Sequence, residues 1–146
     1  MKTSIQLFWS VLRDGGEPPI RKHGDDAGWD LIVSDDTVLS PRRITNVPTA
    51  IAIAIPSGWY GHIIGRSSTS SKLGLLVVEA VIDAGYRGEL FFQVENPHDR
   101  EIMVERGSRL AQILFLHVPA VRWIRTAELP PSHRGTNGFG STGYQK

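Results

Sequence analysis

ITNVPTAIAIAIPSGWYGHII, residues 44–64, is the stretch that decides the fold class. It holds three short apolar runs, and proline or glycine separates each run from the next. Pro48 and Pro56 fall at the ends of runs, where a missing N–H group costs a β-sheet least. Short apolar runs bounded by turn residues predict β-strands. The three predicted strands are ITNV (44–47), IAIAI (51–55) and GHII (61–64).

Similar runs occur on both sides of this stretch. TSIQLFWSVL (3–12) places Ile5, Leu7, Trp9 and Val11 on one parity, which predicts a strand with one buried face. No window of about 12 residues or more has a helical apolar period. Many short strands predict an all-β fold, a jelly-roll-like β-barrel or sandwich. The remaining predicted strands are WDLIV (29–33), LLVV (75–78), LFFQVE (90–95), EIMV (101–104), RLAQILFLHV (109–118) and AVRWI (120–124).

The composition limits the classes of function. A chain of 146 residues fits one domain that buries roughly two-thirds of its unfolded surface. The formal net charge of +1 gives no electrostatic basis for nucleic-acid or membrane binding, so phosphate recognition needs a local cluster of cations. The absence of cysteine excludes disulfides and thiolate zinc sites.

The distribution of apolar residues gives the expected location and domain boundary. No apolar run approaches about 18 residues, and the N-terminus has no export-signal pattern. We therefore expect a soluble protein of the cytoplasm, either of a cell or of the host if a virus encodes it. From Pro130 onward the sequence is polar and rich in glycine. This change predicts a β domain over residues 1–129 and a flexible C-terminal arm over residues 130–146.

Five short segments carry residues suited to phosphate chemistry, although each also has a purely structural reading. Arg66 and the hydroxyls that follow it can hold phosphate oxygens, or form a solvated loop. Asp83 stands at a predicted strand end, where a side chain is held rigidly. Phe139 beside Arg134 is unexpected in a tail that only frays. The segments are AGWD (27–30), GRSSTSSKLG (65–74), VIDAGYRGEL (81–90), GSRLAQILF (107–115) and RGTNGFGSTG (134–143).

In this order, the five segments resemble the five motifs of the trimeric dUTPase family, over a region from about Pro19 to Gly143. The resemblance implies a homotrimer with active sites shared between subunits. It also implies hydrolysis of dUTP to dUMP and pyrophosphate by water attack at the α-phosphorus. This reaction limits uracil in DNA and supplies dUMP for dTMP synthesis.

The resemblance also implies roles for individual residues. Asp83 would be the catalytic base, and Tyr86 would lie against the deoxyribose where a 2′-hydroxyl would otherwise fit. Asp30 would meet the cofactor Mg²⁺ through water, because Mg²⁺ keeps several waters and binds substrate phosphates. The phosphate chain would be held by Arg66, Ser67, Ser68 and Gln112.

The C-terminal motif would complete the site. Arg134 would pair with the γ-phosphate, while Gly140, Ser141 and Thr142 would donate hydrogen bonds to phosphates. Phe139 would stack on uracil, which by analogy with other base–aromatic contacts is worth about 1–3 kcal/mol.

The chain departs from the family pattern just before Asp83. LLVVEAV (75–81) is shorter than the hairpin that normally reads uracil, and it lacks the asparagine and glycine often found there. Base recognition is expected around Val78 to Val81. Glu79 is unusual beside an apolar pocket. At position 29, where the family usually has tyrosine or a smaller residue, this chain has Trp29.

Two alternatives remain. A dCTP deaminase shares the fold but needs a glutamate where this chain has Gln93, and Glu95 lies one strand step away with the same parity. A neutral amide cannot shuttle the proton, which argues against deamination. The second alternative is a regulatory, non-catalytic module, against which the complete motif set argues.

The arm generates the first testable prediction. Ordering about ten residues costs on the order of 10–20 kcal/mol of backbone entropy, so the arm should close only over bound triphosphate, as a lid. Removal of residues 134–146 should leave the fold intact and nearly abolish turnover. Circular dichroism and pyrophosphate release measure these two outcomes. Normal turnover by the truncated chain would contradict the lid.

Overall fold

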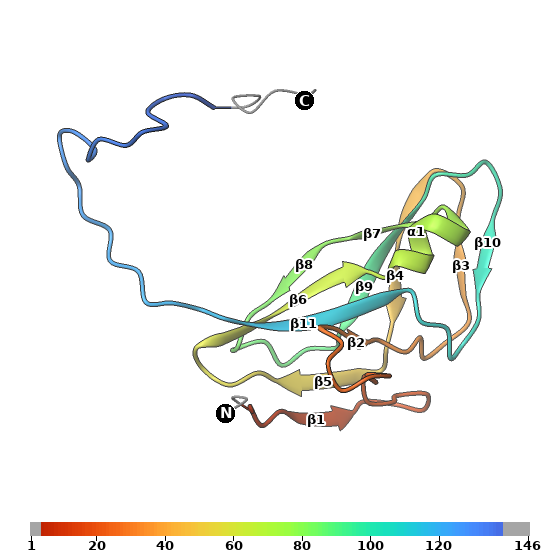
Figure 1. The fold of residues 1–146 in the computed structure, drawn as a ribbon. Helices are drawn as coiled ribbons and strands as arrows, with labels where there is room; N and C mark the ends of the chain where they lie inside the picture. The colour runs from red at the N-terminus through yellow and green to blue at the C-terminus, as the bar shows by residue number, and fades with distance from the viewer. Residues whose placement is uncertain (1–3, 139–146) are drawn as a thin grey trace.

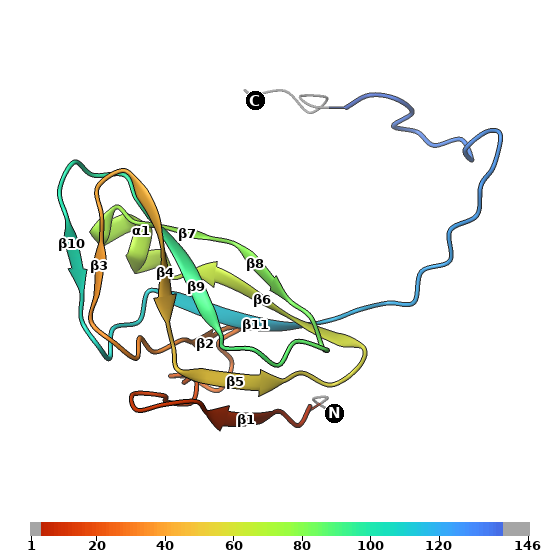
Figure 2. The same ribbon diagram turned by 180° about the vertical axis from the view of Figure 1, so that it is seen from behind.

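The computed structural model describes residues 4–138, which form a nearly all-β fold with one short helix (Figures 1 and 2). The strands are short and separated by turns, as the spacing of apolar runs predicts. The elements are β1 Phe8–Val11, β2 Trp29–Asp30, β3 Thr37–Leu39, β4 Arg43–Pro48, β5 Ile51–Ala54, β6 Trp59–Gly65, α1 Ser67–Leu73, β7 Leu76–Val78, β8 Ala80–Ile82, β9 Phe91–Asn96, β10 Ile102–Val104 and β11 Ala111–His117.

The strands pair antiparallel, mostly with partners distant in sequence. A four-stranded sheet has the order β2-β11-β6-β8, and a three-stranded sheet has the order β4-β9-β7. Two further pairs, β1-β5 and β10-β3, complete the framework. This strand order requires repeated crossing between sheets, which is how an antiparallel sandwich encloses a core.

The core is built by the inward-facing residues of both main sheets. In β9, the buried Phe92 and Val94 alternate with exposed Phe91 and Gln93, which is the period of a strand with one covered face. Ile113 of β11 packs in the same apolar cluster. At Gly61 an added Cβ would lie 2.8 Å from Ile113 Cδ1, so only glycine fits this close approach.

The helix α1 forms within the serine-rich segment that the sequence indicated as a turn. Thr69 is buried, and its hydroxyl donates to the carbonyl of Leu110 at 2.6 Å. Gly74 ends the helix with φ 62°, a left-handed conformation that glycine adopts readily. Its N–H donates to the Ser70 carbonyl. The helix is therefore fixed beside the start of β11.

The first strand differs from its prediction. All four residues of β1 are exposed, and the side chain of Trp9 keeps 46% exposure although it was expected to be buried. Val11 is exposed as well, while Leu7 packs against the core. Among the described residues β1 pairs with β5 alone, so no second layer covers its outer face. The expectation of a buried face was wrong for Trp9 and Val11.

The chain after β11 also differs from the prediction. AVRWI (120–124) forms no strand, because no described neighbour pairs with it, and residues 119–138 are exposed throughout. Figures 1 and 2 show this segment leaving the β domain after β11. Regular structure ends at His117, before the predicted boundary at residue 129.

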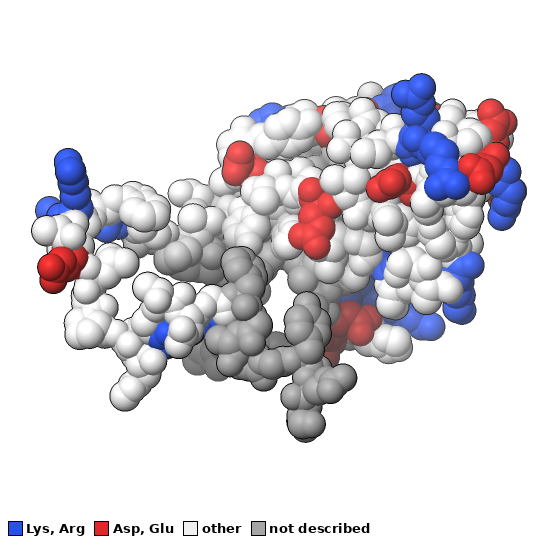
Figure 3. All heavy atoms as spheres, turned by 90° about the horizontal axis from the view of Figure 1, so that it is seen from above, with Lys and Arg blue, Asp and Glu red and all other residues white. Residues whose placement is uncertain are grey.

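The surface carries both signs of charge. Figure 3 shows basic and acidic side chains on the same face, without one sign covering it. Within residues 4–138 no helix is long and apolar enough to span a membrane.

Candidate functional site

Three of the five segments meet at one end of the four-stranded sheet because β11 lies between β2 and β6. Gln112 is opposite Asp30 on one side and opposite Ile64 on the other. Ala111 and Gly65 form the last pair of β11 with β6, and Arg66 is the next residue after this pair. The register of one strand thus positions residues that are far apart in the sequence.

A polar cavity of about 420 Å³ opens where these segments meet. It contains hydrogen-bond donors, cations and two carboxylates, and its cations and donors are suited to a phosphorylated ligand. Its lining residues are Ile20, Lys22, His23, Asp26, Ala27, Gly28, Asp30, Arg66, Ser67, Arg109 and Gln112.

Asp30 lies between two arginines in this cavity. Its Oδ1 is 3.0 Å from Arg66 Nε, and its Oδ2 is 3.1 Å from Arg109 Nη1. Arg66 Nη1 also donates to the Arg109 carbonyl at 2.8 Å. The Asp30 side chain is only 16% exposed, which strengthens these charge-assisted contacts. One carboxylate orients two guanidiniums, and the group keeps a net positive charge.

Gln112 is held against the neighbouring strand. Its Nε2 donates to the Gly65 carbonyl at 3.2 Å. A Cβ at Gly28 would collide with Gln112 Oε1, so a larger residue there would displace the Gln112 side chain from its present position. Ser67 lines the cavity from the first turn of α1, where backbone N–H groups have no intrahelical acceptor. Ser68 follows in the same turn but does not line the cavity.

A second cavity of about 200 Å³ contains Asp83 and Tyr86. Asp83 is exposed at the end of β8. The Tyr86 N–H donates to the Asp83 carbonyl at 3.0 Å, which closes the turn between them. Arg87 Nη1 donates to the Ala84 and Tyr86 carbonyls at 2.6 and 2.8 Å. The lining residues are Ala80, Val81, Ile82, Asp83, Tyr86, Glu89, Phe91 and Gln93.

The two cavities have no lining residue in common. Ile82, which precedes Asp83, pairs with Gly61 near the start of β6, whereas Arg66 follows the last residue of that strand. Five residues at about 3.3 Å each separate Gly61 and Arg66 by roughly 16 Å. Within one chain, Asp83 and the two arginines therefore lie in separate cavities at opposite ends of β6.

The chain matches the dUTPase family model over residues 16–143. It belongs to the dUTPase family. Curated deoxyuridine 5'-triphosphate nucleotidohydrolases are similar over most of their length. That of Leifsonia xyli is 39% identical, with 86% of this chain and 85% of the relative covered. That of Tropheryma whipplei is 40% identical, with 91% and 93% covered.

Solved dUTPase structures confirm the jelly-roll-like fold. The Staphylococcus bacteriophage 80alpha dUTPase with dUpNHpp, a G-to-S mutant, has a TM-score of 0.89 at 28% identity, covering 96% of this chain and 99% of that chain. A dUTPase of phage phi11 of S. aureus, described with a structural Mg(II) ion, has a TM-score of 0.79 at 25% identity, covering 85% and 98%.

The segment expected to read the base in this dUTPase-family chain changes sheets instead of forming a simple hairpin. β7 pairs with β9 in one sheet, β8 pairs with β6 in the other, and Glu79 lies between them. Val78 is opposite Gln93 and lines neither cavity. The Glu79 side chain is 71% exposed and its Oε2 is 3.0 Å from His62 Nε2. The Glu79 carboxylate therefore faces solvent and pairs with His62, and it is not buried in an apolar pocket.

The described part of the arm, residues 130–138, lines neither cavity. Arg134 Nε donates to the Asn137 carbonyl at 2.9 Å, within the exposed segment beyond β11. The other predicted contacts of the arm, Phe139, Gly140, Ser141 and Thr142, lie outside the described residues.

Asp30 is the carboxylate of this cavity that the resemblance assigns to Mg²⁺. Within residues 4–138 no three acidic or histidine side chains are grouped as metal ligands. Both Asp30 oxygens already face guanidiniums, which excludes direct coordination without displacing them and leaves room only for a contact through water. Mg²⁺ commonly binds in this way, carried mainly by substrate phosphates.

Arg109 lines this cavity although it was not predicted as a site residue, and so do Lys22, His23 and Asp26. A signal for Arg109 was present, since a cation stands at the start of the run RLAQILF, but only the pairing of β2 with β11 reveals its partner Asp30.

Proposed function

We propose that this member of the dUTPase family hydrolyses dUTP to dUMP and pyrophosphate, with Asp83 as the base that activates water. The proposal rests on the observation that residues of the family's motifs line two separate cavities. One cavity presents a carboxylate and a tyrosine, and the other presents two arginines, a serine and a glutamine.

Asp83 orients the water and accepts its proton. The water oxygen forms a bond to the α-phosphorus, and the bond from that phosphorus to the bridging oxygen of the β-phosphate breaks, which releases pyrophosphate. A carboxylate is a weak base toward water, so positioning supplies most of its effect. The end of β8, paired to β6 through Ile82, provides this rigid position.

Tyr86 contacts the deoxyribose. Its ring lines the cavity that contains Asp83, and its hydroxyl donates to the Glu89 carbonyl at 2.9 Å. This bond fixes the ring in one orientation. A ribose is then rejected because its 2′-hydroxyl meets the ring, not because a hydrogen bond is missing.

The arginine cavity binds the phosphate chain. Arg66 supplies fixed positive charge, Gln112 and Ser67 donate hydrogen bonds, and the Ser68 amide region extends the same first turn of α1. Arg109 joins them, because Asp30 holds it beside Arg66. Pre-oriented donors are worth more than mobile ones because they need no reorganisation on binding.

The protein acts as a homotrimer in which one subunit's Asp83 meets a neighbour's Arg66. The separation of about 16 Å within one chain supports this arrangement. In a closed ring, each pair of neighbours forms the same contact, so every complete site is shared. The arm closes over such a site, with Arg134 at the γ-phosphate and Phe139 on uracil.

Asp30 would hold the cofactor Mg²⁺ of the triphosphate through water. When bound, the cation neutralises part of the charge of the phosphate chain. Val78 and its neighbours in 78–81 contact the uracil base.

The deaminase alternative receives no support from the site. Gln93 Nε2 donates to Asn46 Oδ1 at 3.0 Å, so its amide is engaged as a hydrogen-bond donor. An amide does not exchange protons as an acid or base at neutral pH. Incubation with dCTP should release no ammonia.

Asp83→Asn should lower kcat for dUTP by about 10²–10⁴-fold, the usual contribution of a general base. The amide keeps the size of the side chain but cannot accept the water proton. Pyrophosphate release measures the effect, and Asp99→Asn, at an exposed carboxylate that lines neither cavity, is the matched control. Unchanged kcat in Asp83→Asn would remove this residue from the mechanism.

Mixed trimers test the shared site. Asp83→Asn and Arg66→Ala chains, each inactive alone, are unfolded together and refolded. Because about three quarters of randomly formed trimers are mixed and each mixed trimer regains one intact site, roughly a quarter of wild-type turnover should return. If the mixture stays as inactive as its components, Asp83 and Arg66 act within one chain.

Asp30→Asn should raise the Mg²⁺ concentration that gives half-maximal turnover, because an amide attracts the hydrated cation less strongly. It should also raise KM for dUTP, since both arginines lose a charged partner. Arg109→Gln is the control, because it breaks one ion pair and leaves the carboxylate. If the Mg²⁺ concentration for half-maximal turnover shifts equally in both variants, Asp30 only orients the arginines and does not contact the hydrated cation.

A further inference from the structure

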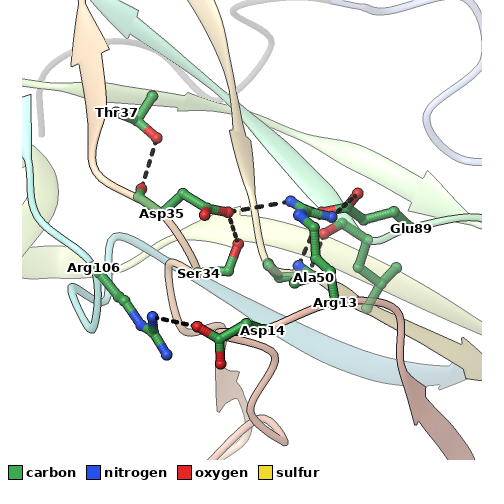
Figure 4. A network of polar contacts seen from close by, with 10 residues as sticks. Arg13, Asp14, Ser34, Asp35, Thr37, Ala50, Glu89 and Arg106 are labelled. Carbon is green, nitrogen blue, oxygen red and sulfur yellow. Dashed lines mark hydrogen bonds and ion pairs between the residues drawn. The ribbon is translucent and has the colours of Figure 1, made fainter.

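An ion-pair network joins Arg13 to Asp35 and Glu89 (Figure 4). Glu89 lies at the end of the turn that begins with Asp83 and contains Tyr86. Arg13, just after β1, forms a two-pronged contact with Glu89: Nη1 is 2.7 Å from Oε2, and Nη2 is 3.0 Å from Oε1. Nη2 also lies 3.2 Å from Asp35 Oδ2. Paired N–H···O bonds of this kind fix orientation as well as distance.

Glu89 is also tied to the main chain of the β4–β5 connection. The Ala50 N–H donates to Glu89 Oε1 at 2.9 Å, and Ala50 has φ 57°, an unusual conformation for a residue with a side chain. The Glu89 side chain is 21% exposed. Hydrogen bonding from Arg13 holds the pKa of the Glu89 carboxyl below its ordinary range, so the carboxylate is charged at neutral pH.

Glu89 connects this network to the sugar-facing residue. The Tyr86 hydroxyl donates to the Glu89 carbonyl oxygen at 2.9 Å, and Glu89 itself lines the cavity that contains Asp83. An added Cβ at Gly88 would collide with the Tyr86 hydroxyl, so the ring lies directly over the turn. The position of the Glu89 backbone therefore sets where the Tyr86 ring rests.

The turn is held at both ends by the sheets, since Ile82 pairs with Gly61 and the Leu90 N–H donates to the Ile51 carbonyl at 2.8 Å. Between these ends the bonds of Tyr86 N–H and of Arg87 are local to the turn. The Glu89 side chain adds an anchor that is not local, because it contacts Arg13 and the Ala50 N–H.

We propose that Arg13 and Glu89 are positioning residues for sugar selection, which hold Tyr86 where it rejects a 2′-hydroxyl. This inference rests on the proposed function, because it assigns the ring of Tyr86 to the deoxyribose. Arg13 lies outside all five family-like segments, and it reaches the site only through Glu89. The N-terminal segment thus acts on substrate choice without touching substrate.

The test compares kcat/KM for dUTP and UTP in Arg13→Gln and Glu89→Gln. Glutamine at position 89 can still accept the Ala50 N–H but no longer attracts the guanidinium. A small misplacement at a reacting centre can cost about 10²-fold, so we expect a roughly tenfold fall in the dUTP-over-UTP ratio. Arg13→Lys, which keeps the charge without the paired geometry, should restore part of the ratio.

Asp35→Asn is the matched control. It removes the second carboxylate partner of the same arginine, yet it touches no residue of the turn. Its dUTP-over-UTP ratio should stay at the wild-type value. The double variant Arg13→Gln/Glu89→Gln should be no worse than either single variant, since both changes break one contact. Thermal unfolding of each variant separates loss of stability from loss of selectivity.

The outcomes separate the two claims. If wild type hydrolyses dUTP but Arg13→Gln and Glu89→Gln keep the wild-type ratio, the positioning role is wrong and the proposed function stands. A ratio that falls equally in Asp35→Asn would also overturn the role, because general weakening would explain it. If wild type releases no pyrophosphate from dUTP, the proposed function itself fails.

Discussion

The register of β11 between β2 and β6 is the constraint on which the phosphate-binding half of the structure depends. It places Gln112 opposite both Asp30 and Ile64, and so brings three segments that are distant in sequence to the same end of the sheet. A slip of one residue would turn every side chain of β11 to the other face. Ile113 in the core excludes that slip, because it is buried with the apolar cluster. Packing in the interior thus determines the geometry of the cavity.

The same sheet separates the two parts of the proposed site. β8 pairs with β6 near its start, and the arginine cavity lies beyond its end, so the fold keeps Asp83 and the arginines apart in one chain. A rigid strand cannot shorten this distance. The proposed trimer would bring the two parts together at a contact between subunits. The exposed β1 face and the long segment after His117 likewise leave apolar side chains uncovered in the single chain.

The sequence predicted a large part of this structure. Alternating apolar residues and turn residues located most strands, and motif order identified Asp83, Tyr86, Arg66 and Gln112 as site candidates. These features are local in sequence, or they belong to a pattern that resembles a family. The roles themselves are predictions that activity measurements must test.

Other features depend on pairing between distant residues, which a single sequence does not encode in readable form. The ion pair of Arg109 with Asp30 joins residues 79 positions apart. The helix α1 has no apolar period because it is short and is fixed mainly by one buried hydroxyl, Thr69. Trp9 has the parity of a buried residue but remains exposed, since parity gives a face and not a covering layer.

The two halves of the proposed site differ in when their order is established. Strand pairing and the contacts of Asp30 orient the two arginines during folding. Binding of a ligand there does not then carry the entropic cost of ordering their side chains. The turn that carries Tyr86 is more exposed, and the contact of Glu89 with Arg13 and Ala50 adds to its anchoring by the strands on either side. Residues 119–138 are exposed, so the proposed closure of this segment would have to be stabilised by the ligand. In the proposed function, selectivity for the sugar would depend on the more exposed half of the site, and phosphate binding on the half that the core fixes.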